Sequence, residues 1–415
     1  MPIFTSLSPN TEKNDIFLAL KLIFSPAKWK KGNTIEKLET EFSNYLGVKH
    51  AISFNSGRSG LLAILKSLNL AEKSEILIQG FTCNAVVNPI LWSELKPVYV
   101  DIDETLNINP KELEKKAGKK SRAVLVQHTF GHPAKLDEIL GICEKKDLIL
   151  IEDCAHSLGA VYKGKKVGTF GQAAFFSFGR DKIISSVYGG VVVTNDDDLA
   201  QKIRNFQKNL DFPSNLWIVQ QLLHPVLTNF LIIPFYDFFE FGRWILLFFQ
   251  KTKILSKAVH KKEKEGEMPD YIPQKMPNAL AILAYKQFKK LGKFIFHQKG
   301  LAGFYDDNLA GLDFELPEIN PERVYMRYPL LVENKETDEI LKKARKQKIF
   351  LDDGWRKAVV TPVDTNQEKM EYRKGTCPKA EKVAENILNL PTHINISKKR
   401  AQKIINFLKD FYYGD

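Results

Sequence analysis

The chain has 415 residues, of which 44% are hydrophobic and 27% are charged, and its formal net charge is +12. This composition is that of a globular protein, and the length favours one large domain with a smaller one over a single small core. Many of the lysines stand in short charged stretches such as 115–120 and 398–403, and arginines do not alternate with aromatic residues there. We therefore expect no nucleic acid among the partners.

The cysteines and the first residues set further limits. Cys83, Cys143, Cys154 and Cys377 are scattered, and none forms a CxxC pair or a Cys/His cluster. We therefore expect neither a disulfide framework nor a metal site. The first fifteen residues lack a basic region followed by an apolar one, so a cytoplasmic protein is expected.

Between residues 50 and 210, short apolar runs alternate with segments of helical periodicity. Most runs are continuously apolar, as in a parallel sheet that is covered by helices on both faces. The pattern predicts an α/β fold with a mostly parallel sheet of about seven strands. The predicted strands cover 50–54, 75–79, 97–101, 122–127, 148–153, 173–178 and 189–194, and the predicted helices 60–68, 84–92, 110–116 and 136–145.

Residues 211–265 break this pattern with a segment dense in Leu, Ile, Phe and Trp, which ends in a basic tract. No run of about 18–20 residues is free of polar residues or proline, so we do not expect a clean transmembrane helix. Pro225 and Pro234 should break or kink helices. Two interpretations stay open: an insertion that packs against the body or a second subunit, and a peripheral element in a membrane interface beside its basic residues.

After residue 266 the composition returns to that of an ordinary α/β domain. We therefore divide the chain into a large domain, 1–265, which includes the hydrophobic insertion 211–265, and a smaller C-terminal α/β domain, 266–415. The predicted helices of this second domain cover 278–291, 336–346, 380–388 and 398–412, and a strand is predicted at 324–332.

The segment IEDC places two acids, Glu152 and Asp153, at the end of a predicted buried strand. A buried carboxylate is costly unless a cation lies against it. Downstream, Lys182 stands in a loop between two predicted strands, five residues after Ser177. Upstream, the segment FNSGRSG forms a strand end and a small-residue turn before a helix, and such a turn offers backbone N–H groups to an anion.

Together these residues meet the requirements of pyridoxal phosphate (PLP), namely a lysine for the aldehyde, an acid for the pyridinium nitrogen and a phosphate cradle. Asp153 is the predicted acid, so the pyridinium is the cation that offsets its burial. Lys182 is the predicted amine. The phosphate is expected on the Gly57 and Arg58 amides and the Ser177 hydroxyl.

Three neighbouring residues are interpreted differently. We expect Glu152 to be structural rather than catalytic. Arg180 and Tyr188 flank the lysine, and a role in holding a substrate carboxylate or phosphate stays open for both.

The segments IEDCAHSLGAVYKGKKVGTFG, FSFGRDK and NSGRSGLL resemble the sugar aminotransferases of the DegT/DnrJ/EryC1/StrS family. Further segments at 96–114, 124–139, 275–291 and 377–397 fit that family in the same order. The resemblance implies the fold type I, aspartate aminotransferase-like architecture, with a homodimer whose active site lies at the subunit interface.

The resemblance also implies roles for single residues. Lys182 stands at the position of the lysine that bonds the cofactor and moves protons, Asp153 at that of the pyridinium partner, and His156 near the phenolic oxygen. An aromatic residue of the FTCNAVV segment usually covers the cofactor ring. Phe81 is our choice, although the register leaves Cys83 open. The implied cofactor contacts are Ser56, Gly57, Arg58, Phe81, Asp153, His156, Ser177 and Lys182.

The sequence departs from the family pattern at several positions. Pro273 replaces the Asn that reaches the partner subunit's cofactor phosphate, and Lys275 replaces an Arg, so Lys275 or Asn278 would have to supply that contact. Arg58 replaces a Thr in the phosphate turn. The insertion falls where family members build substrate and dimer contacts, so the sugar cannot be named.

The resemblance therefore implies an aminotransferase that moves an amino group from glutamate to a keto-sugar for cell-surface polysaccharide or amino-sugar synthesis. We expect the keto-sugar to be nucleotide-linked. Two alternatives stay open. A related sugar dehydratase would carry histidine in place of Lys182, which argues against it. A non-catalytic, membrane-associated binding protein would use the 211–265 segment.

Overall fold

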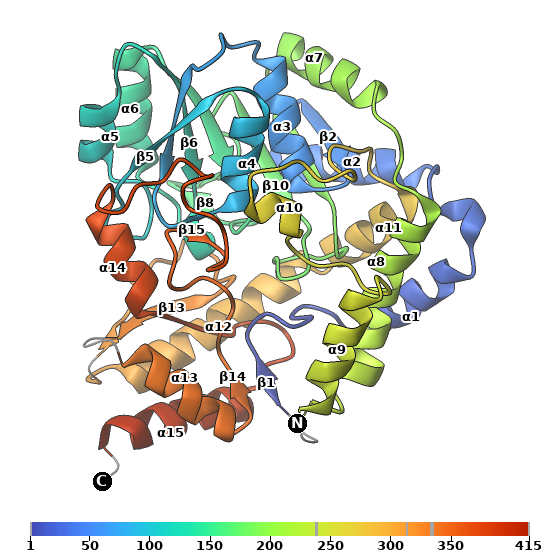
Figure 1. Ribbon diagram of the computed structural model, residues 1–415, viewed down its shortest axis with the longest axis vertical. Helices are drawn as coiled ribbons and strands as arrows, with labels where there is room; N and C mark the ends of the chain where they lie inside the picture. Colours follow the sequence, from blue (N-terminus) through green and yellow to red (C-terminus); the bar gives the residue numbers. More distant parts are fainter. Residues whose placement is uncertain (1, 237–239, 313, 333–335, 414–415) are drawn as a thin grey trace.

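The computed structural model describes residues 2–236, 240–312, 314–332 and 336–413, and its centre is a seven-stranded sheet (Figure 1). The strand order is β2-β11-β10-β7-β6-β3-β5, in which β11 runs antiparallel to both neighbours and the other pairs are parallel. The predicted α/β fold with a mostly parallel sheet is confirmed. The strands are β2 (His50–Phe54), β3 (Glu75–Gln79), β5 (Lys96–Val100), β6 (Ser121–Gln127), β7 (Ile149–Asp153), β10 (Ala173–Ser177) and β11 (Gly190–Thr194).

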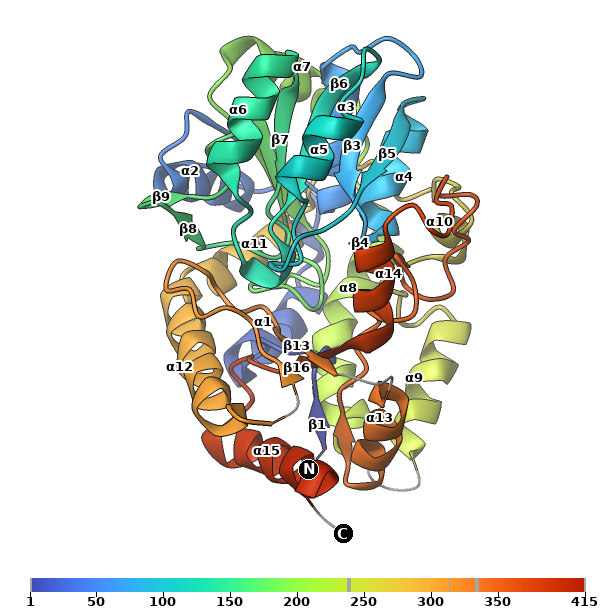
Figure 2. The ribbon, with the colours of Figure 1, turned by 90° about the vertical axis from the view of Figure 1, so that its left-hand side faces the viewer.

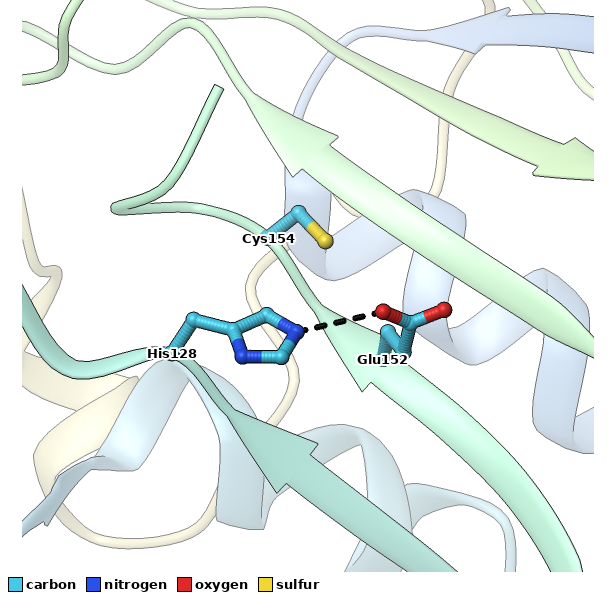
Figure 3. Close-up of side chains that lie close together, drawn as sticks. All are labelled: His128, Glu152 and Cys154. Atoms are coloured by element: carbon cyan, nitrogen blue, oxygen red, sulfur yellow. Dashed lines mark hydrogen bonds and ion pairs between the residues drawn. The ribbon is translucent and has the colours of Figure 1, made fainter. Parts of the chain in front are cut away.

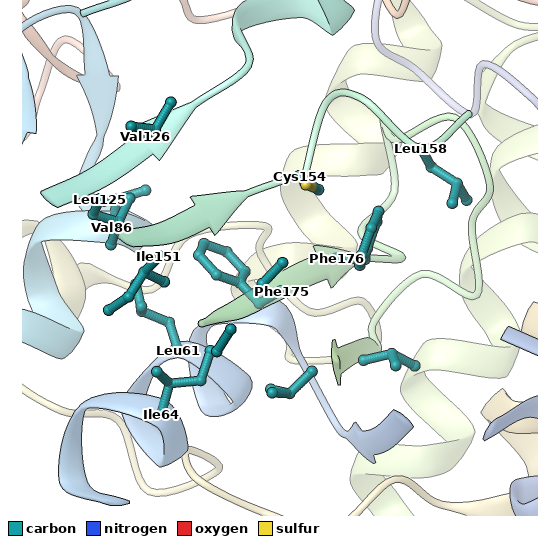
Figure 4. Packing of buried hydrophobic residues seen from close by; sticks show 14 of the residues in the cluster. Leu61, Ile64, Val86, Leu125, Val126, Ile151, Cys154, Leu158, Phe175 and Phe176 are labelled. Atoms are coloured by element: carbon teal, nitrogen blue, oxygen red, sulfur yellow. The ribbon is translucent and has the colours of Figure 1, made fainter. Parts of the chain in front are cut away.

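Helices lie on both faces of this sheet (Figures 1 and 2), and consecutive residues of β10 show why the strands are apolar throughout. Phe176 packs against Phe42 of α2 (Thr34–Leu46), with ring centroids 5.0 Å apart. Phe175 instead lies close to Gly60 of α3 (Gly57–Ser67). Figure 4 shows the apolar side chains that fill the space around these strands, among them Leu61 of α3. The other helices around the sheet are α4 (Asn84–Trp92), α5 (Pro110–Lys116), α6 (Leu136–Lys146), α7 (Asp197–Lys208) and α11 (Asn278–Phe288).

A second hydrophobic core surrounds the antiparallel sheet β12-β13-β16, below the main sheet in Figure 2. Its strands are β12 (Phe314–Glu315), β13 (Tyr328–Val332) and β16 (Ile387–Leu390), and its helices are α12 (Leu291–Leu309), α13 (Thr337–Lys346) and α15 (Lys398–Tyr413). Ile3 of β1 (Ile3–Phe4) belongs to this core, and β1 pairs with β14 (Ile349–Phe350). The domain boundary at 265/266 stays a prediction. Two elements cross it in space: β1, which precedes the boundary, packs in the second core, and α11, which follows it, packs in the main core.

Several predicted elements differ in extent from the observed ones. The predicted helix 278–291 ends at Phe288, and α12, which was not predicted, carries Gly292, Gly300 and Gly303. Glycine lowers helix propensity, and burial of one face of α12 outweighs that cost. The predicted helix 380–388 is α14 (Pro378–Asn386) followed by β16. Short elements complete the chain: β4 (Thr82–Cys83) with β15 (Val360–Thr361), β8 (Val161–Tyr162) with β9 (Lys165–Lys166), and the 3-10 turns η1 (Pro26–Lys28) and η2 (Thr129–Gly131).

The 211–265 segment forms α8 (Asn215–Leu227), the π-helix η3 (Thr228–Ile232), α9 (Phe241–Lys251) and α10 (Lys261–Lys264), while 237–239 lie outside the described residues. α8 packs against α1 (Lys13–Ile23) and buries Ile218 and Leu222. Pro225 lies inside α8 instead of ending it. By length and composition, 215–235 could cross a membrane, but half of its most apolar window is buried within the protein. This burial supports the interpretation of α8 as an insertion that packs against the body.

The close approach of α3 to the sheet gives a stability prediction. A Cβ at Gly60 would lie 2.8 Å from Cγ2 of Val192 on β11, whereas a Cβ at Gly141 of α6 meets nothing within 4 Å. We expect Gly60→Ala to lower the free energy of unfolding by about 1–3 kcal/mol through overpacking. Gly141→Ala should raise it by up to about 1 kcal/mol, because alanine favours the helix. Thermal unfolding of both variants checks this, and equal midpoints would contradict the packing described.

Candidate functional site

A cavity of about 560 Å³ lies at the carboxyl ends of β7 and β10, which is where α/β sheets bind ligands. Asp153 ends β7 and Ser177 ends β10, and both side chains line the cavity. The other walls include the first turn of α3, part of the insertion and the 353–355 loop, whose Trp355 packs in the main core. All the predicted cofactor contacts except Phe81 lie along this one cavity.

Asp153 is the buried acid of the site, with 3% of its surface exposed. Its Oδ1 accepts a hydrogen bond from the Ala155 amide, at 2.9 Å. Burial raises the pKa of Asp153 to about 6, and the Ala155 amide and the positive charge of Lys182 offset part of that rise. The carboxylate is therefore poorly compensated, and a cation placed in the cavity would stabilise its ionised form.

Lys182 lies in the loop after β10, and its side chain is 15% exposed. Its Nζ is 3.6 Å from Oδ1 of Asp181. Asp181 also receives Nη2 of Arg327 at 3.1 Å, and Nε of Arg327 lies 2.7 Å from Oδ2 of Asp353. Burial opposes ionisation of Asp181, but the charges of Lys182 and Arg327 outweigh it and lower the pKa of this carboxyl. Arg327 and Asp353 thus connect the lysine loop to the second core.

The small-residue turn forms the N-terminus of α3, which begins at Gly57 rather than at the predicted residue 60. Ser56 caps the helix by accepting a hydrogen bond from the Ser59 amide, at 3.1 Å. A Cβ at Gly57 would lie 3.1 Å from the Ser177 Cβ, so glycine allows the turn to approach the end of β10. The free backbone N–H groups of this first turn and the Ser177 hydroxyl therefore lie close together along the cavity.

The Arg58 side chain turns away from the helix N-terminus. Its guanidinium forms an ion pair with Glu263 of α10, which is fully buried and also accepts a hydrogen bond from the Tyr271 hydroxyl at 3.0 Å. Sequence reasoning missed Glu263, because this acid stands in the basic tract KKEKEGE and looks like a solvated residue. The insertion is thereby connected to the turn.

His156 also lines the cavity, and it lies within an aromatic cluster. Its ring stacks on Phe130 with centroids 5.6 Å apart, and Trp355 meets it edge-on at 5.0 Å. Burial, with the nearby charge of Lys182, lowers the pKa of His156 well below its usual value. The imidazole is therefore neutral and available for a hydrogen bond or a stacking contact.

Phe81 does not reach the cavity. It has no exposed surface, and its ring packs against Phe130 and Trp355 at 6.1 and 5.5 Å. Cys83, the alternative in the same segment, lines the cavity. This packing therefore does not support Phe81 as the ring-covering residue, and the sequence alone could not fix the register of the FTCNAVV segment.

Glu152 points to the other side of β7 and belongs to a buried network that includes His128 (Figure 3). Its oxygens accept hydrogen bonds from the amides of Gly168, Phe170 and Gly171 at 2.7 to 2.8 Å. Nδ1 of His128 accepts from the Ala134 amide, so Nε2 is the donor to Glu152, at 3.2 Å. These bonds occupy the carboxylate and both ring nitrogens, which agrees with a structural role for Glu152.

The sequence matches one known protein family and several curated proteins. The sequence profile of the DegT/DnrJ/EryC1/StrS aminotransferase family matches residues 10–210 and 252–409. GDP-perosamine synthase of Escherichia coli O157:H7 is 27% identical over 389 residues, which cover 92% of this chain and 91% of that protein. An uncharacterized protein of Methanocaldococcus jannaschii is 41% identical over 206 residues, but the match spans only about half of each, 49% and 52%.

Solved structures share the fold over the whole chain. Helicobacter pylori PseC, an aminotransferase involved in the biosynthesis of pseudoaminic acid, superposes with a TM-score of 0.77 at 23% identity and full coverage of both chains. The E coli GDP-4-keto-6-deoxy-D-mannose-3-dehydratase, solved with bound hydrated PLP, has a TM-score of 0.75 at 19% identity and covers 99% of this chain and 100% of its own. The predicted fold type I architecture is confirmed. From the profile match, the chain belongs to the DegT/DnrJ/EryC1/StrS aminotransferase family.

Proposed function

We propose that this protein is a PLP-dependent aminotransferase that moves an amino group from glutamate to a keto-sugar carried on a nucleotide. The observation that carries the proposal is that Asp153 and Lys182 line one cavity beside the N-terminus of α3. The relatives support the substrate class, because one is named as a GDP-sugar enzyme and another as a UDP-sugar aminotransferase.

The side chains along the cavity fit PLP. The poorly compensated Asp153 suits the ring nitrogen, and the turn at Gly57 with Ser177 suits the phosphate. His156, neutral and stacked on its aromatic neighbours, suits one flank of the ring, and Cys83 rather than Phe81 suits the other. When bound, PLP supplies an electron-accepting ring that stabilises negative charge as a proton leaves the amino-bearing carbon.

The protein's own residues have three tasks in this proposal. Asp153 holds a proton at the ring nitrogen, because its buried carboxylate favours a positive charge there. Lys182 Nζ would hold the cofactor through its aldehyde and would move the proton of the amino-bearing carbon. Asp181 forms ion pairs with both Arg327 and the Lys182 Nζ, and so keeps the lysine loop in place.

The related dehydratase reaction is the alternative within the same fold, as the similar E coli structure illustrates. The lysine at position 182 favours the aminotransferase, since the family resemblance links dehydration to histidine at that position. The non-catalytic alternative does not account for an uncompensated acid and a lysine along one cavity.

We further propose a homodimer in the cytoplasm with the active site at the subunit interface. The two residues offered as substitutes for the missing Asn are bound within their own chain. Nζ of Lys275 donates to the Lys208 carbonyl, and Nδ2 of Asn278 donates to the Lys28 carbonyl, both at 2.8 Å. A phosphate contact across the interface therefore needs a rearrangement of one of them or a different residue.

The central test is replacement of the lysine. Purified protein should show the yellow absorbance of lysine-bound PLP, and glutamate should bleach it while 2-oxoglutarate appears. Lys182→Ala should lack the absorbance and lose amino transfer by at least about 10²-fold, because the proton shuttle is gone. Lys202→Ala, an exposed lysine on α7, is the matched control. Retention of the absorbance in Lys182→Ala would contradict the assignment.

The raised pKa of Asp153 predicts how cofactor affinity depends on pH. The free carboxyl takes up a proton below a pH of about 6, whereas a carboxyl paired with the pyridinium stays ionised to lower pH. Binding must then release that proton, so affinity should fall by up to about tenfold per pH unit below 6. Titrations of apoprotein with PLP between pH 5 and 7.5 measure this. Asp153→Asn should bind more weakly and lose the dependence, and equal profiles for the two proteins would refute the role.

For the insertion we also propose a peripheral contact with a membrane. On α9, Phe241, Trp244 and Phe248 are each more than half exposed and lie on one side of the helix, together with Lys251. η3 packs against α9 and carries the exposed Phe230. The ring centroid of Phe230 lies 6.3 Å from that of Phe17 on α1.

α1 also presents exposed aromatic side chains beside a lysine. Phe17 and Phe24 are exposed at spacings that place them on one side with Lys21. Neither Lys21 nor Lys251 has a carboxylate partner in the described part of the chain. Aromatic side chains beside unpaired lysines suit the surface of an anionic bilayer.

Liposome flotation tests the contact. The intact protein should float with vesicles of phosphatidylcholine and phosphatidylglycerol at least tenfold better than with phosphatidylcholine alone, and less at high salt. The double variant Trp244→Ser with Phe248→Ser should lose this binding, whereas Phe296→Ser, at a still more exposed Phe of α12, should keep it. Equal flotation of both variants, or a change of oligomeric size without lipid binding, would reject the membrane as the occupant.

A further inference from the structure

Three arginines lie in or beside the cavity, and they differ in how their charge is balanced. Arg58 is paired with the buried Glu263. Arg327 lies between two carboxylates, those of Asp181 and Asp353. Arg180 has no carboxylate within 4.0 Å in the part of the chain that the structure describes. It therefore brings an unbalanced positive charge to the wall of the cavity.

The insertion and a tyrosine ring hold the Arg180 side chain in place. Its Nη2 donates to the hydroxyl of Ser256, which donates to Oε1 of Gln221 on α8 at 2.7 Å. Its Cζ lies 5.6 Å from the ring centroid of Tyr188, and the Tyr188 hydroxyl is itself fixed by the Lys257 carbonyl at 2.7 Å. The guanidinium is thus preorganised before any ligand binds.

Its donors are not all used. Nε of Arg180 is buried and has no hydrogen-bond partner, and a buried donor without a partner is costly. Burial lowers the pKa of Arg180, and the nearby Arg58 charge adds to this effect, although Tyr188 opposes it. His224 of α8 also lines the cavity, and burial together with Arg180 lowers its pKa well below the usual value, so it stays neutral beside the arginine.

We propose that Arg180 is an oxyanion-binding residue of this cavity and takes a phosphate or carboxylate group. The inference deepens the proposed aminotransferase function and rests on it for the identity of the ligands. A guanidinium suits either group because it can present two parallel N–H donors to two oxygens. Two sources carry such a group: the cofactor phosphate, which lacks its usual contact from a partner Asn, and the acid group of a substrate.

The variant Arg180→Met tests the proposal. Arg122 is an exposed arginine near the start of β6, and Arg122→Met is the matched control. Removal of an unpaired charge should leave the melting temperature of Arg180→Met unchanged or raised. Inorganic phosphate should raise the melting temperature of wild-type apoprotein and of Arg122→Met, but not that of Arg180→Met. This readout needs neither bound cofactor nor activity, so it stands even if the proposed function fails.

Two further titrations distinguish the sources. If Arg180 holds the cofactor phosphate, Arg180→Met weakens PLP binding at least tenfold and leaves binding of pyridoxal, which has no phosphate, unchanged. If it holds a substrate acid, PLP binding is unchanged, and at saturating PLP the glutamate or keto-sugar nucleotide concentration for half-maximal conversion rises at least tenfold. Both results support the anion site. Phosphate stabilisation, PLP affinity and substrate dependence all equal to wild type would overturn it.

Discussion

The site depends on one buried carboxylate. Asp153 ends β7, which pairs with β6 on one side and β10 on the other, so the sheet fixes its position, and only 3% of its surface is exposed. Burial also opposes ionisation of its neighbour Glu152, but His128 and the amides of Gly168 and Gly171 outweigh it and lower the pKa of that acid. Two adjacent acids thus differ in their surroundings, because one has its partners within the fold and the other faces the cavity.

The insertion changes how this cavity is enclosed. Leu246 and Gln250 of α9 line the cavity, while Trp244 and Phe248 of the same helix face outward. A single helix, about 10 Å across, therefore separates the ligands from the aromatic surface. The buried ion pair between Arg58 and Glu263 joins the same insertion to the N-terminus of α3.

Much of this arrangement was predictable from the sequence. The apolar strands, the acid at the end of β7, the lysine after β10 and the small-residue turn of α3 are local patterns, and each lies where it was expected along one cavity. The failures involve tertiary packing. Phe81 and Cys83 are two residues apart, and only packing against Phe130 and Trp355 decides which of them reaches the cavity. Glu263 and the pairing of Arg327 with Asp181 join distant segments, and no local pattern marks them.

The claim at the centre of this account is that Asp153 keeps a proton on the ring nitrogen of PLP. Nitrogen NMR of the protein loaded with ¹⁵N-labelled PLP measures that proton directly. The account predicts the chemical shift of a protonated ring nitrogen at neutral pH, and the shift of an unprotonated nitrogen in Asp153→Asn. An unprotonated ring nitrogen in the wild-type protein, or the same shift in both proteins, would contradict it.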